Sequence, residues 1–336
     1  MKVVEIREGF GLDRLALSDR PCPEAGPGQV LLRMRAVALN YRDLLTVLGR
    51  YNPKQPLPLV PGSDGVGEVV AVGAGVTRVR PGERVIPIFA QRWLAGAPTR
   101  EKLRSTLGGP ADGTLAEYLV LHEDGLVQAP GHLSDPEAAT LPCSGVTAWN
   151  ALVGEGPLLP GSTVLVQGTG GVSVFALQIA RLAGARVIVT SSSEAKLGRA
   201  RELGAWETIH YPSVPDWGAA ARRLTGGVGV DVVVDVGGTQ TLRESLSAVA
   251  FGGQISLVGN LTGGAVELDV VPIFMRQVRL QGILVGHRES LEAFTRTVAA
   301  SGMRPVVDRV FPLGEIRAAL EHMRSGNHFG KVCIEL

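Results

Sequence analysis

The sequence predicts an α/β protein with a β-rich first domain and a second domain built on a doubly wound parallel sheet. Three observations predict it. A glycine-rich turn joins a buried strand to a helix within residues 163–185. Strands and helices alternate from residue 134 onward, which favours a parallel sheet. The 336 residues also exceed what one core usually serves. We place the first domain at 1–126, completed by 290–336, and the second at 127–289.

Composition excludes several classes of function. The net charge is +1 without a long basic or acidic run, so the chain offers no general electrostatic footprint for nucleic acid or an anionic membrane. Cys22, Cys143 and Cys333 form no CxxC pair, which argues against a disulfide framework or a zinc ribbon and fits a reducing compartment. Residues 1–6 alternate like a strand rather than a signal peptide. We therefore expect a cytoplasmic protein with a small-molecule substrate.

The first domain consists mainly of short strands separated by turns. Strands with alternating or β-branched patterns are expected at 29–39, 65–72 and 83–88. Pro-Gly dipeptides recur before such strands, because proline presets the first turn angle and glycine accepts the second. A single helix is expected at 41–48, with Asn40 as its N-cap. Residues 91–113 have weak periodicity and are interpreted as a surface loop that could act as a flap.

The second domain alternates strands with helices. Strands are expected at 163–167, 186–190, 207–210, 231–236 and 254–258, and helices at 172–183, 194–203 and 241–250. Right-handed crossovers place the carboxyl ends of parallel strands at one edge, so the loops that follow should converge on one ligand. Two of these loops contain Gly237 and Gly259. The segment after 289 is expected to return to the first domain, because the parallel sheet is already complete.

The glycine-rich turn gives the strongest indication of a ligand. It lies between a buried strand and a helix, and a helix N-terminus favours an anion such as a pyrophosphate. The third glycine of the GxGxxG pattern is replaced by Ser173, which is still small enough for close packing of helix on strand. An ordinary tight strand–helix turn would show the same local pattern. The residues predicted to hold a dinucleotide are Gly168, Thr169, Gly170, Gly171 and Val172.

The end of the second strand favours NADP(H) over NAD(H). A site for NAD usually carries an acidic residue about twenty positions after the turn. Serines occupy 191–193 instead, and Lys196 follows one helical turn later, so Ser192 and Lys196 are predicted to bind a 2′-phosphate. A serine here could equally well only cap the next helix. Tyr211, after the third strand, is predicted to cover the adenosine phosphate, with a packed surface tyrosine as the alternative.

The order of motifs resembles the medium-chain dehydrogenase/reductase superfamily over essentially the whole chain. The motifs are LPCSGVTAW at 141–149, VLVQGTGGV at 164–172, GGQISLVG at 252–259 and GKV at 330–332. The resemblance implies a GroES-like domain, formed from both chain ends, around a Rossmann domain, with a nicotinamide dinucleotide between them. It also implies that Thr147 and Lys331 lie near the cofactor. A homodimer through edge strands around 266–285 is implied as well.

The resemblance breaks at the metal positions. Many alcohol dehydrogenases of the superfamily bind a catalytic zinc through Cys, His and Cys, and the matching positions here are Asn40, Ser63 and Cys143. Zinc needs three protein ligands with thiolate, imidazole or carboxylate donors. An amide, a hydroxyl and one thiol do not supply them, and Cys143 is as readily a small buried residue. Residues 91–113 contain no cysteine for a structural zinc. The sequence therefore predicts no metal.

What remains resembles the zinc-free branch, which includes quinone oxidoreductases and enoyl reductases. Residues 40–43 (NYRD) with 49–51 (GRY) are similar to the N-[FY]-R-D…G-x-Y pattern of polyketide synthase enoyl reductases. Within this pattern Arg42 and Asp43 are expected to make structural hydrogen bonds. Quinone oxidoreductases often have a tyrosine where this chain has Leu45, which cannot donate a proton.

Without a metal, hydrogen bonds must stabilise the enolate that forms when a hydride adds to an enone. The predicted catalytic residues are Asn40, Tyr41 and Tyr51; helix capping, helix packing and a surface ring are their respective structural alternatives. The sequence thus predicts a zinc-independent, NADPH-dependent oxidoreductase acting on quinones or α,β-unsaturated carbonyls. A NADP-dependent alcohol or aldehyde dehydrogenase and a non-catalytic NADPH-binding protein remain the alternatives.

Overall fold

The computed structural model describes residues 1–336, which divide into two compact units. Unit 1 comprises 1–146 with 285–336, and unit 2 comprises 147–284. These boundaries differ from the predicted ones at 126 and 290. The segment 127–146 belongs to unit 1 because its helix α3 (Asp135–Ala139) packs on the unit 1 strands β3 and β4.

Unit 1 is organised around a seven-stranded sheet of order β14-β15-β3-β4-β5-β7, in which β6 also pairs with β3; β1 and β2 form a separate pair. The strands are β1 (Lys2–Ile6), β2 (Leu15–Asp19), β3 (Gln29–Ala38), β4 (Asp64–Val72), β5 (Arg84–Pro87), β6 (Tyr118–His122), β7 (Leu126–Gln128), β14 (Val307–Pro312) and β15 (Lys331–Glu335). The C-terminal strand β15 pairs antiparallel with β3, with Cys333 opposite Ala38. This pairing confirms that the C-terminal segment returns to the first domain.

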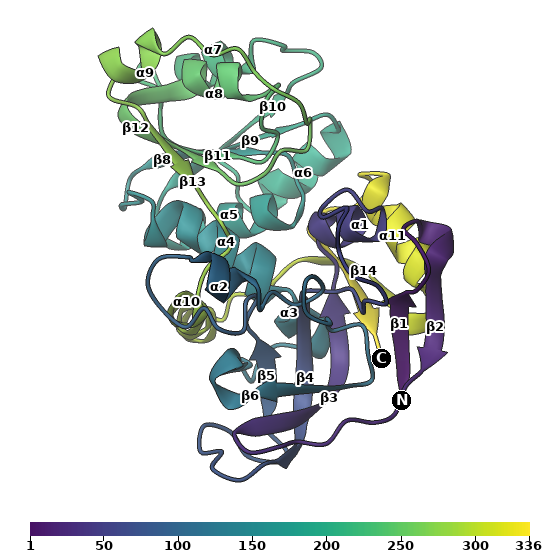
Figure 1. Ribbon diagram of the computed structural model, residues 1–336. Helices are drawn as coiled ribbons and strands as arrows, with labels where there is room; N and C mark the ends of the chain where they lie inside the picture. Colours follow the sequence, from purple (N-terminus) through teal and green to yellow (C-terminus); the bar gives the residue numbers. More distant parts are fainter. The chain divides into compact units, whose positions relative to one another are not determined.

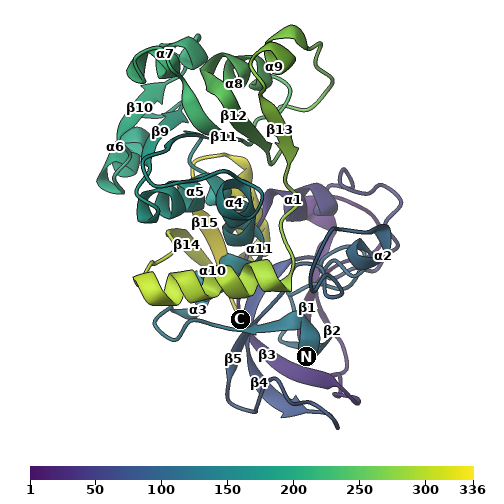
Figure 2. The same cartoon turned by 90° about the vertical axis from the view of Figure 1, so that its left-hand side faces the viewer.

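The helices of unit 1 cover this sheet at several places. They are α1 (Tyr41–Val47), α2 (Arg100–Leu103), α3, α10 (Arg288–Ser301) and α11 (Ile316–Arg324). α11 packs on β14 and β15 and also on α1, whereas α10, which lies in the foreground of Figure 2, packs on β7. α2 lies inside the segment predicted to be a loop. It forms because the Thr99 side chain accepts a hydrogen bond from the Lys102 backbone N–H at 3.2 Å.

Unit 2 is a doubly wound parallel sheet of order β10-β9-β8-β11-β12-β13. Its strands are β8 (Thr163–Gln167), β9 (Arg186–Ser191), β10 (Glu207–His210), β11 (Val230–Asp235), β12 (Val249–Leu257) and β13 (Arg279–Gly282), and its helices are α5 (Gly171–Leu182), α6 (Glu194–Glu202), α7 (Trp217–Leu224), α8 (Leu242–Ala248) and α9 (Val271–Met275). Figure 1 shows α7 and α8 on one face of the sheet and α5 and α6 on the other. The predicted α/β fold class is confirmed, although α7 and α9 were not assigned from the sequence.

The chain passes from unit 1 to unit 2 through one irregular helical segment. A π-helical turn, η3 (Leu141–Gly145), is followed by α4 (Val146–Trp149) and a second π-helical turn, η4 (Asn150–Gly154). Such turns occur mostly as local insertions, frequently at functional sites. No helix of the structure is both long enough and apolar enough to cross a membrane.

Candidate active site and cofactor loops

The three residues at the metal positions are buried in unit 1. Asn40 precedes α1, Ser63 precedes β4, and Cys143 lies in the turn η3. The Asn40 amide Nδ2 donates hydrogen bonds to Ser63 Oγ at 3.3 Å and to Asp64 Oδ2 at 2.9 Å. Asn40 therefore uses its side chain within a buried polar cluster, in addition to its position at the start of the helix.

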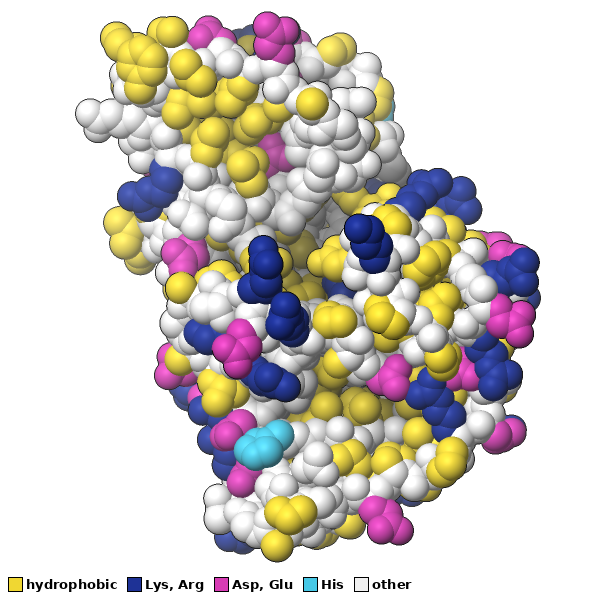
Figure 3. Space-filling model, viewed as in Figure 1, with side chains coloured by type: hydrophobic (Ala, Val, Ile, Leu, Met, Phe, Trp, Pro, Cys, Tyr) yellow, Lys and Arg dark blue, Asp and Glu magenta, His cyan; other side chains and the backbone are white.

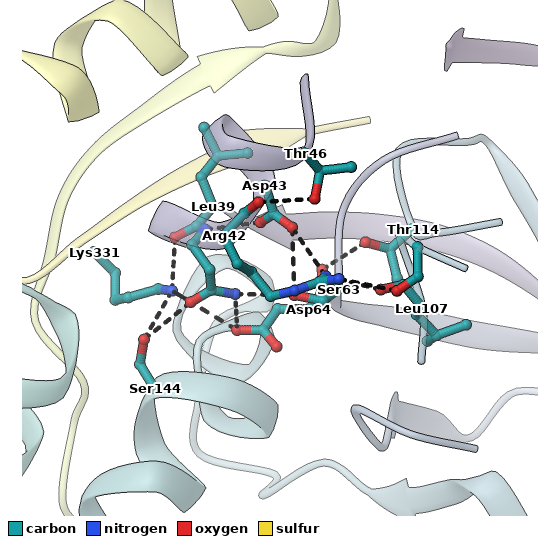
Figure 4. A network of polar contacts seen from close by, with 12 residues as sticks. Leu39, Arg42, Asp43, Thr46, Ser63, Asp64, Leu107, Thr114, Ser144 and Lys331 are labelled. Atoms are coloured by element: carbon teal, nitrogen blue, oxygen red, sulfur yellow. Dashed lines mark hydrogen bonds and ion pairs between the residues drawn. The ribbon is translucent and has the colours of Figure 1, made fainter. Parts of the chain in front are cut away.

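Lys331 is the centre of this cluster, as Figure 4 shows. Its Nζ atom donates hydrogen bonds to Leu39 O at 2.7 Å, Asn40 Oδ1 at 2.6 Å and Ser144 Oγ at 3.1 Å. Asp64 Oδ2 lies 3.7 Å from the same nitrogen. Ser144 in turn donates to Asn40 Oδ1 at 3.0 Å. We call Asn40, Ser63, Asp64, Ser144 and Lys331 the Lys331 network.

Lys331 lies beside Asn40 in unit 1, and its predicted cofactor role stays a prediction. An ammonium group has three donors, and these bond to Leu39 O, Asn40 Oδ1 and Ser144 Oγ. Sequence reasoning missed Asp64 and Ser144. A signal was available, because each directly follows a metal position, Ser63 and Cys143 respectively.

Arg42 and Asp43 make structural hydrogen bonds to the backbone next to the network, as expected. The Asp43 carboxylate accepts a hydrogen bond from the Asn40 backbone N–H at 2.8 Å, which fixes the start of α1. The Arg42 guanidinium donates to Leu107 O at 2.9 Å and to Gly109 O at 3.0 Å. Both residues are buried. They set the backbone positions on which the network depends.

The two predicted catalytic tyrosines lie apart from the network. Tyr41 is 43% exposed and Tyr51 is 48% exposed, and neither hydroxyl group is hydrogen-bonded. The Tyr51 ring stacks under the Arg42 guanidinium, 4.8 Å from its centroid. Of the predicted catalytic set, only Asn40 therefore lies within the network, whereas both tyrosines point their hydroxyl groups toward solvent on unit 1.

Burial dominates the electrostatics of the network. It raises the pKa of Asp64 to about 7, although the Lys331 ammonium and the Asn40 amide act in the opposite direction. Burial also raises the pKa of Asp43 and the pKa of the Cys143 thiol, so Cys143 stays protonated at neutral pH. Asp64 Oδ1 is buried without a hydrogen-bond partner. The network thus contains an acid that changes its protonation near neutral pH, a property typical of functional sites.

The donor set at these positions does not fit zinc. No three His, Cys, Asp or Glu side chains of the structure come together as metal ligands. The Asn40 oxygen already accepts from Lys331 at 2.6 Å, and an ammonium at that distance would repel a divalent cation. The Cys143 thiol would also have to lose a proton that its burial retains. The residues at these positions therefore do not fit zinc, and zinc independence of the reaction stays a prediction.

In unit 2 the glycine-rich turn forms an open cradle ahead of α5. Gly168 has φ +70°, a backbone conformation that favours glycine, and its N–H donates to Thr190 O at 2.8 Å. A Cβ atom built on Gly168 or Gly170 would meet no protein atom within 4 Å. Ser173, in place of the third glycine, donates to Gln167 O at 2.7 Å and so holds the first turn of α5 on β8. The cradle fits a pyrophosphate at the helix N-terminus, where Thr169, Gly171 and Val172 also lie.

The second loop brings the predicted 2′-phosphate residues to the same edge. Ser192 is exposed directly after β9, and Lys196 lies one turn along α6. The Tyr211 N–H donates to Ser191 O at 3.2 Å, which holds the Tyr211 backbone beside the end of β9, and its side chain is partly exposed. Ser193, not Ser192, caps α6 by accepting from the Lys196 N–H at 3.4 Å. The capping alternative therefore applies to Ser193 and leaves the Ser192 hydroxyl available.

A buried set of hydrogen bonds fixes the third loop. The Gln167 amide donates to Ser245 Oγ at 2.7 Å, and Ser245 donates to Asp235 Oδ2 at 2.6 Å. The Gly237 N–H donates back to Gln167 Oε1 at 3.3 Å. This cluster, which we call the Asp235 network, bridges β8 and β11, where the strand order reverses and ligands of such sheets bind.

Two further predicted cofactor residues lie in or near these loops. A Cβ atom on Gly259 would come 2.8 Å from Val236 O, so glycine permits the close approach of the third and fourth loops. Thr262 Oγ1 joins the same loops by donating to Gly237 O at 2.8 Å. Thr147 is buried in α4, at the start of unit 2. The polar edge of unit 2 thus has the donors and the open cradle that a dinucleotide requires.

A β-rich unit with a buried polar site and a parallel-sheet unit with a glycine-rich cradle together define a two-domain dehydrogenase/reductase architecture. Residues 26–131 match the family model of the alcohol dehydrogenase GroES-like domain, and residues 171–300 match that of the zinc-binding dehydrogenase. A zinc-type alcohol dehydrogenase-like protein of Schizosaccharomyces pombe is 42% identical over 97% of this chain and 96% of its own length. The chain belongs to the medium-chain dehydrogenase/reductase superfamily and is an oxidoreductase of that family.

Two other similar proteins differ in the activity that their names state. The crystal structure of a NAD-dependent alcohol dehydrogenase superposes with a TM-score of 0.91 at 39% identity, covering 100% of both chains. An acryloyl-coenzyme A reductase of Metallosphaera sedula is 31% identical over 93% of both chains. The comparisons thus show the family and the fold. The names of the similar proteins refer to alcohol dehydrogenases and to an acryloyl-coenzyme A reductase, so they do not agree on one reaction.

Proposed function

We propose that this protein is a zinc-independent, NADPH-dependent oxidoreductase that reduces α,β-unsaturated carbonyl compounds or quinones. The observation that carries the proposal is the Lys331 network. At two of the positions where many relatives place zinc ligands, this chain has the Asn40 amide and the Ser63 hydroxyl, which are hydrogen-bonded to each other, and the amide also accepts from the buried Lys331 ammonium. The enoyl reductase named among the similar proteins supports the same class of reaction.

The chemistry of an enone suits these residues. NADPH supplies a hydride to the β-carbon when it is bound, and the resulting enolate takes up one proton. Lys331 holds a buried positive charge beside the Asn40 amide, and its potential favours the negative charge that develops on a nearby substrate oxygen. Its donors are already bonded within unit 1, so it acts through its charge rather than through a hydrogen bond to the substrate. Such a site assists an activated enone more readily than it ionises an alcohol.

Protonation within the network follows from Asp64. With the pKa of Asp64 near 7, its unpartnered Oδ1 atom holds a proton in about half of the molecules at neutral pH. Protonation of Asp64 removes the one carboxylate within 4 Å of the Lys331 ammonium and so raises the positive potential of the network. Asp64 therefore acts as a positioning residue that sets the charge around Asn40.

The choice of NADPH rests on the end of β9. The serines there and Lys196 offer hydroxyl and ammonium donors to a 2′-phosphate. Glu194, the acidic residue in the first turn of α6, lies 3.8 Å from Arg201 and 3.9 Å from His210. Its carboxylate therefore lies beside the Arg201 guanidinium and the His210 ring. Fluorescence titration with NADPH and NADH tests this choice, and tighter binding of NADH would reject it.

A NADP-dependent alcohol dehydrogenase is the second candidate, favoured by the names of the relatives. Steady-state assays separate the two. We expect NADPH oxidation with enones or quinones, and little NADP⁺ reduction with a panel of alcohols. The reverse pattern would overturn the proposal, and so would zinc retained stoichiometrically in active protein after purification. Tight NADPH binding without any turnover would identify a non-catalytic binding protein.

We also propose that the protein is a homodimer through β13. This strand is the open edge of the unit 2 sheet, so its backbone N–H and C=O groups are available to a second copy. Large exposed apolar side chains surround it over α9 and the end of β12 (Figure 3); they are Phe251, Val270, Val271, Phe274 and Met275. Sedimentation velocity tests the proposal, with Phe274→Asp expected to produce monomers. A wild-type monomer at micromolar concentration would reject it.

A further inference from the structure

Unit 1 carries a concentration of positive charge that the proposed reaction does not use. The segments 50–55 and 91–105 together hold six basic residues and one acidic residue, whereas the whole chain has 33 basic and 32 acidic residues. Five of the six basic side chains are exposed and form no ion pair. They are Arg50, Lys54, Arg92, Arg100 and Arg104, and we call them the basic rim.

Three arginines of the basic rim are held close together by the backbone. Arg100 and Arg104 lie one helical turn apart at α2, since the Arg104 N–H donates to Arg100 O at 3.2 Å. The Arg92 N–H donates to Ser105 Oγ at 2.8 Å, which brings Arg92 alongside Arg104. Like charges one turn apart destabilise a helix. Glu101 is the one carboxylate in these segments and forms no ion pair with Arg92, Arg100 or Arg104, so the excess of positive charge favours an anionic ligand.

The sixth basic residue gives the segment a fixed shape. The Lys102 ammonium donates to Ala95 O and to Ala97 O, each at 2.8 Å, and so closes the loop that precedes α2. The Trp93 indole N–H donates to Gly96 O at 2.6 Å within the same loop. Figure 3 shows Lys and Arg side chains gathered on the surface over α2. The arginines are therefore presented from a constrained segment, which lowers the entropic cost of binding.

The basic rim borders the Lys331 network within unit 1. Arg42, two residues after Asn40, donates to Leu107 O and Gly109 O. The Gln55 amide donates to Pro110 O at 3.4 Å in the same loop. Both basic segments therefore flank residues 106–110, which hydrogen bonds connect to the start of α1. A ligand seated on the rim would have one end near the candidate active site.

On the basis of the function proposed above, we infer that the unsaturated carbonyl substrate is a thioester of coenzyme A whose phosphates bind the basic rim. Guanidinium groups bind phosphate oxygens in bidentate pairs. Coenzyme A combines a diphosphate and a 3′-phosphate with a long flexible pantetheine arm. Its phosphates can stay at the exposed rim while the thioester reaches the Lys331 network. A simple enone has no group for these arginines.

The test compares crotonyl-CoA with crotonyl-pantetheine, which has the same thioester but no phosphate, at saturating NADPH. Wild type should prefer crotonyl-CoA in kcat/KM, and the preference should shrink as salt screens the rim. Arg100→Gln/Arg104→Gln should lower that preference about tenfold, mainly through KM, because two phosphate contacts are lost. Arg296→Gln is the matched control, since Arg296 is an exposed arginine of α10 without an ion pair. It should leave the preference unchanged.

A binding measurement separates this inference from the proposed function. Calorimetry of 3′,5′-ADP with protein saturated in NADP⁺ should show binding that Arg100→Gln/Arg104→Gln weakens about tenfold and Arg296→Gln does not. Equal kcat/KM for the two thioesters in wild type, or equal 3′,5′-ADP affinity in the double variant, would overturn the inference. Competition by inorganic phosphate as effective as that by 3′,5′-ADP would also overturn it. If the wild-type protein bound 3′,5′-ADP through the basic rim but reduced neither enones nor thioesters, the proposed function would be refuted and the phosphate-binding role of the rim would stand.

Discussion

Each unit contains a fully buried aspartate, Asp235 in unit 2 and Asp64 in unit 1. The two carboxylates differ in how many of their oxygen atoms accept hydrogen bonds. In unit 2, Asp235 Oδ1 accepts from the Gly238 N–H at 2.9 Å and Thr241 Oγ1 at 2.7 Å, while Oδ2 accepts from Ser245. In unit 1, Asp64 Oδ2 accepts from Asn40, and Oδ1 has no partner. A satisfied buried carboxylate anchors a loop, whereas an incompletely bonded one beside an ammonium retains a proton to exchange. The same residue type thus anchors a loop in unit 2, whereas in unit 1 we propose that it sets the charge of the Lys331 network.

The largest expected effect is the loss of stability when the well-bonded aspartate of unit 2, Asp235, is removed. Asp235→Ala should lower the free energy of unfolding by about 4 kcal/mol, because it removes the acceptor of three hydrogen bonds and leaves the buried Ser245 hydroxyl and the Gly238 N–H unpaired. Urea denaturation followed by circular dichroism measures this change. Asp231→Ala is the matched control on the same strand, since Asp231 is exposed and accepts one backbone bond from Thr163. A similar loss in both variants would remove the distinction between the networks.

The pH dependence of the free energy of unfolding tests the raised pKa of Asp64 in unit 1. The pKa of Asp64 is about 7 in the folded chain against a usual 3.8, so the folded state keeps a proton that the unfolded state has released between these values. The stability from this group is fully present below about pH 4 and is lost as the pH rises to about 7. Wild type should therefore be more stable at pH 5 than at pH 8 by about 2–3 kcal/mol from this group alone.

Asp64→Asn isolates that contribution. The variant removes the titrating proton, so its free energy of unfolding should change less between pH 5 and pH 8 than that of wild type. Urea titrations at the two pH values give both differences. An unchanged pH dependence would show that Asp64 does not titrate in this window, and the contrast with Asp235 would then be lost.

Removal of the buried ammonium should affect catalysis more than cofactor binding. Lys331→Met should lower kcat for an enone about thirtyfold, because the buried positive charge beside Asn40 is lost. The dissociation constant of NADPH should stay within about twofold, because the three Lys331 donors bond to Leu39 O, Asn40 Oδ1 and Ser144 Oγ. Stopped-flow hydride transfer and fluorescence titration measure the two quantities. A large loss of NADPH affinity with unchanged kcat would instead support the predicted cofactor role of Lys331.

The smallest effect concerns cofactor preference in unit 2. Lys196→Gln should weaken NADPH binding about tenfold and leave NADH binding nearly unchanged, because NADPH alone of the two cofactors carries the 2′-phosphate that we propose Lys196 contacts. Arg243→Gln serves as the control, since Arg243 is an exposed arginine elsewhere in unit 2 without an ion pair. Equal weakening of both cofactors would place Lys196 near a group that they share.

The sequence by itself determined the features that depend on neighbouring residues. The alternation of buried strands and amphipathic helices predicted the parallel sheet of unit 2, and β8, α5 and β10 lie close to the expected residues. The absence of zinc-type donors at Asn40 and Ser63 was also readable, because it concerns residue identity alone. The prediction of a 2′-phosphate site at the serines after β9 also came from residue identity alone. Each of these inferences rests on a local period or on a chemical group.

Only the tertiary structure decided which distant groups meet. Lys331 is 291 positions from Asn40, and the antiparallel register of β15 on β3 brings them together. Other contacts between distant segments placed Asp64 and Ser144 in the network and packed α3 on β3 and β4 of unit 1, and the exposure of Tyr41 and Tyr51 was likewise decided by the fold. Local sequence encodes the period of a strand but not its partner, because strand pairing is selected by the burial of the whole sheet.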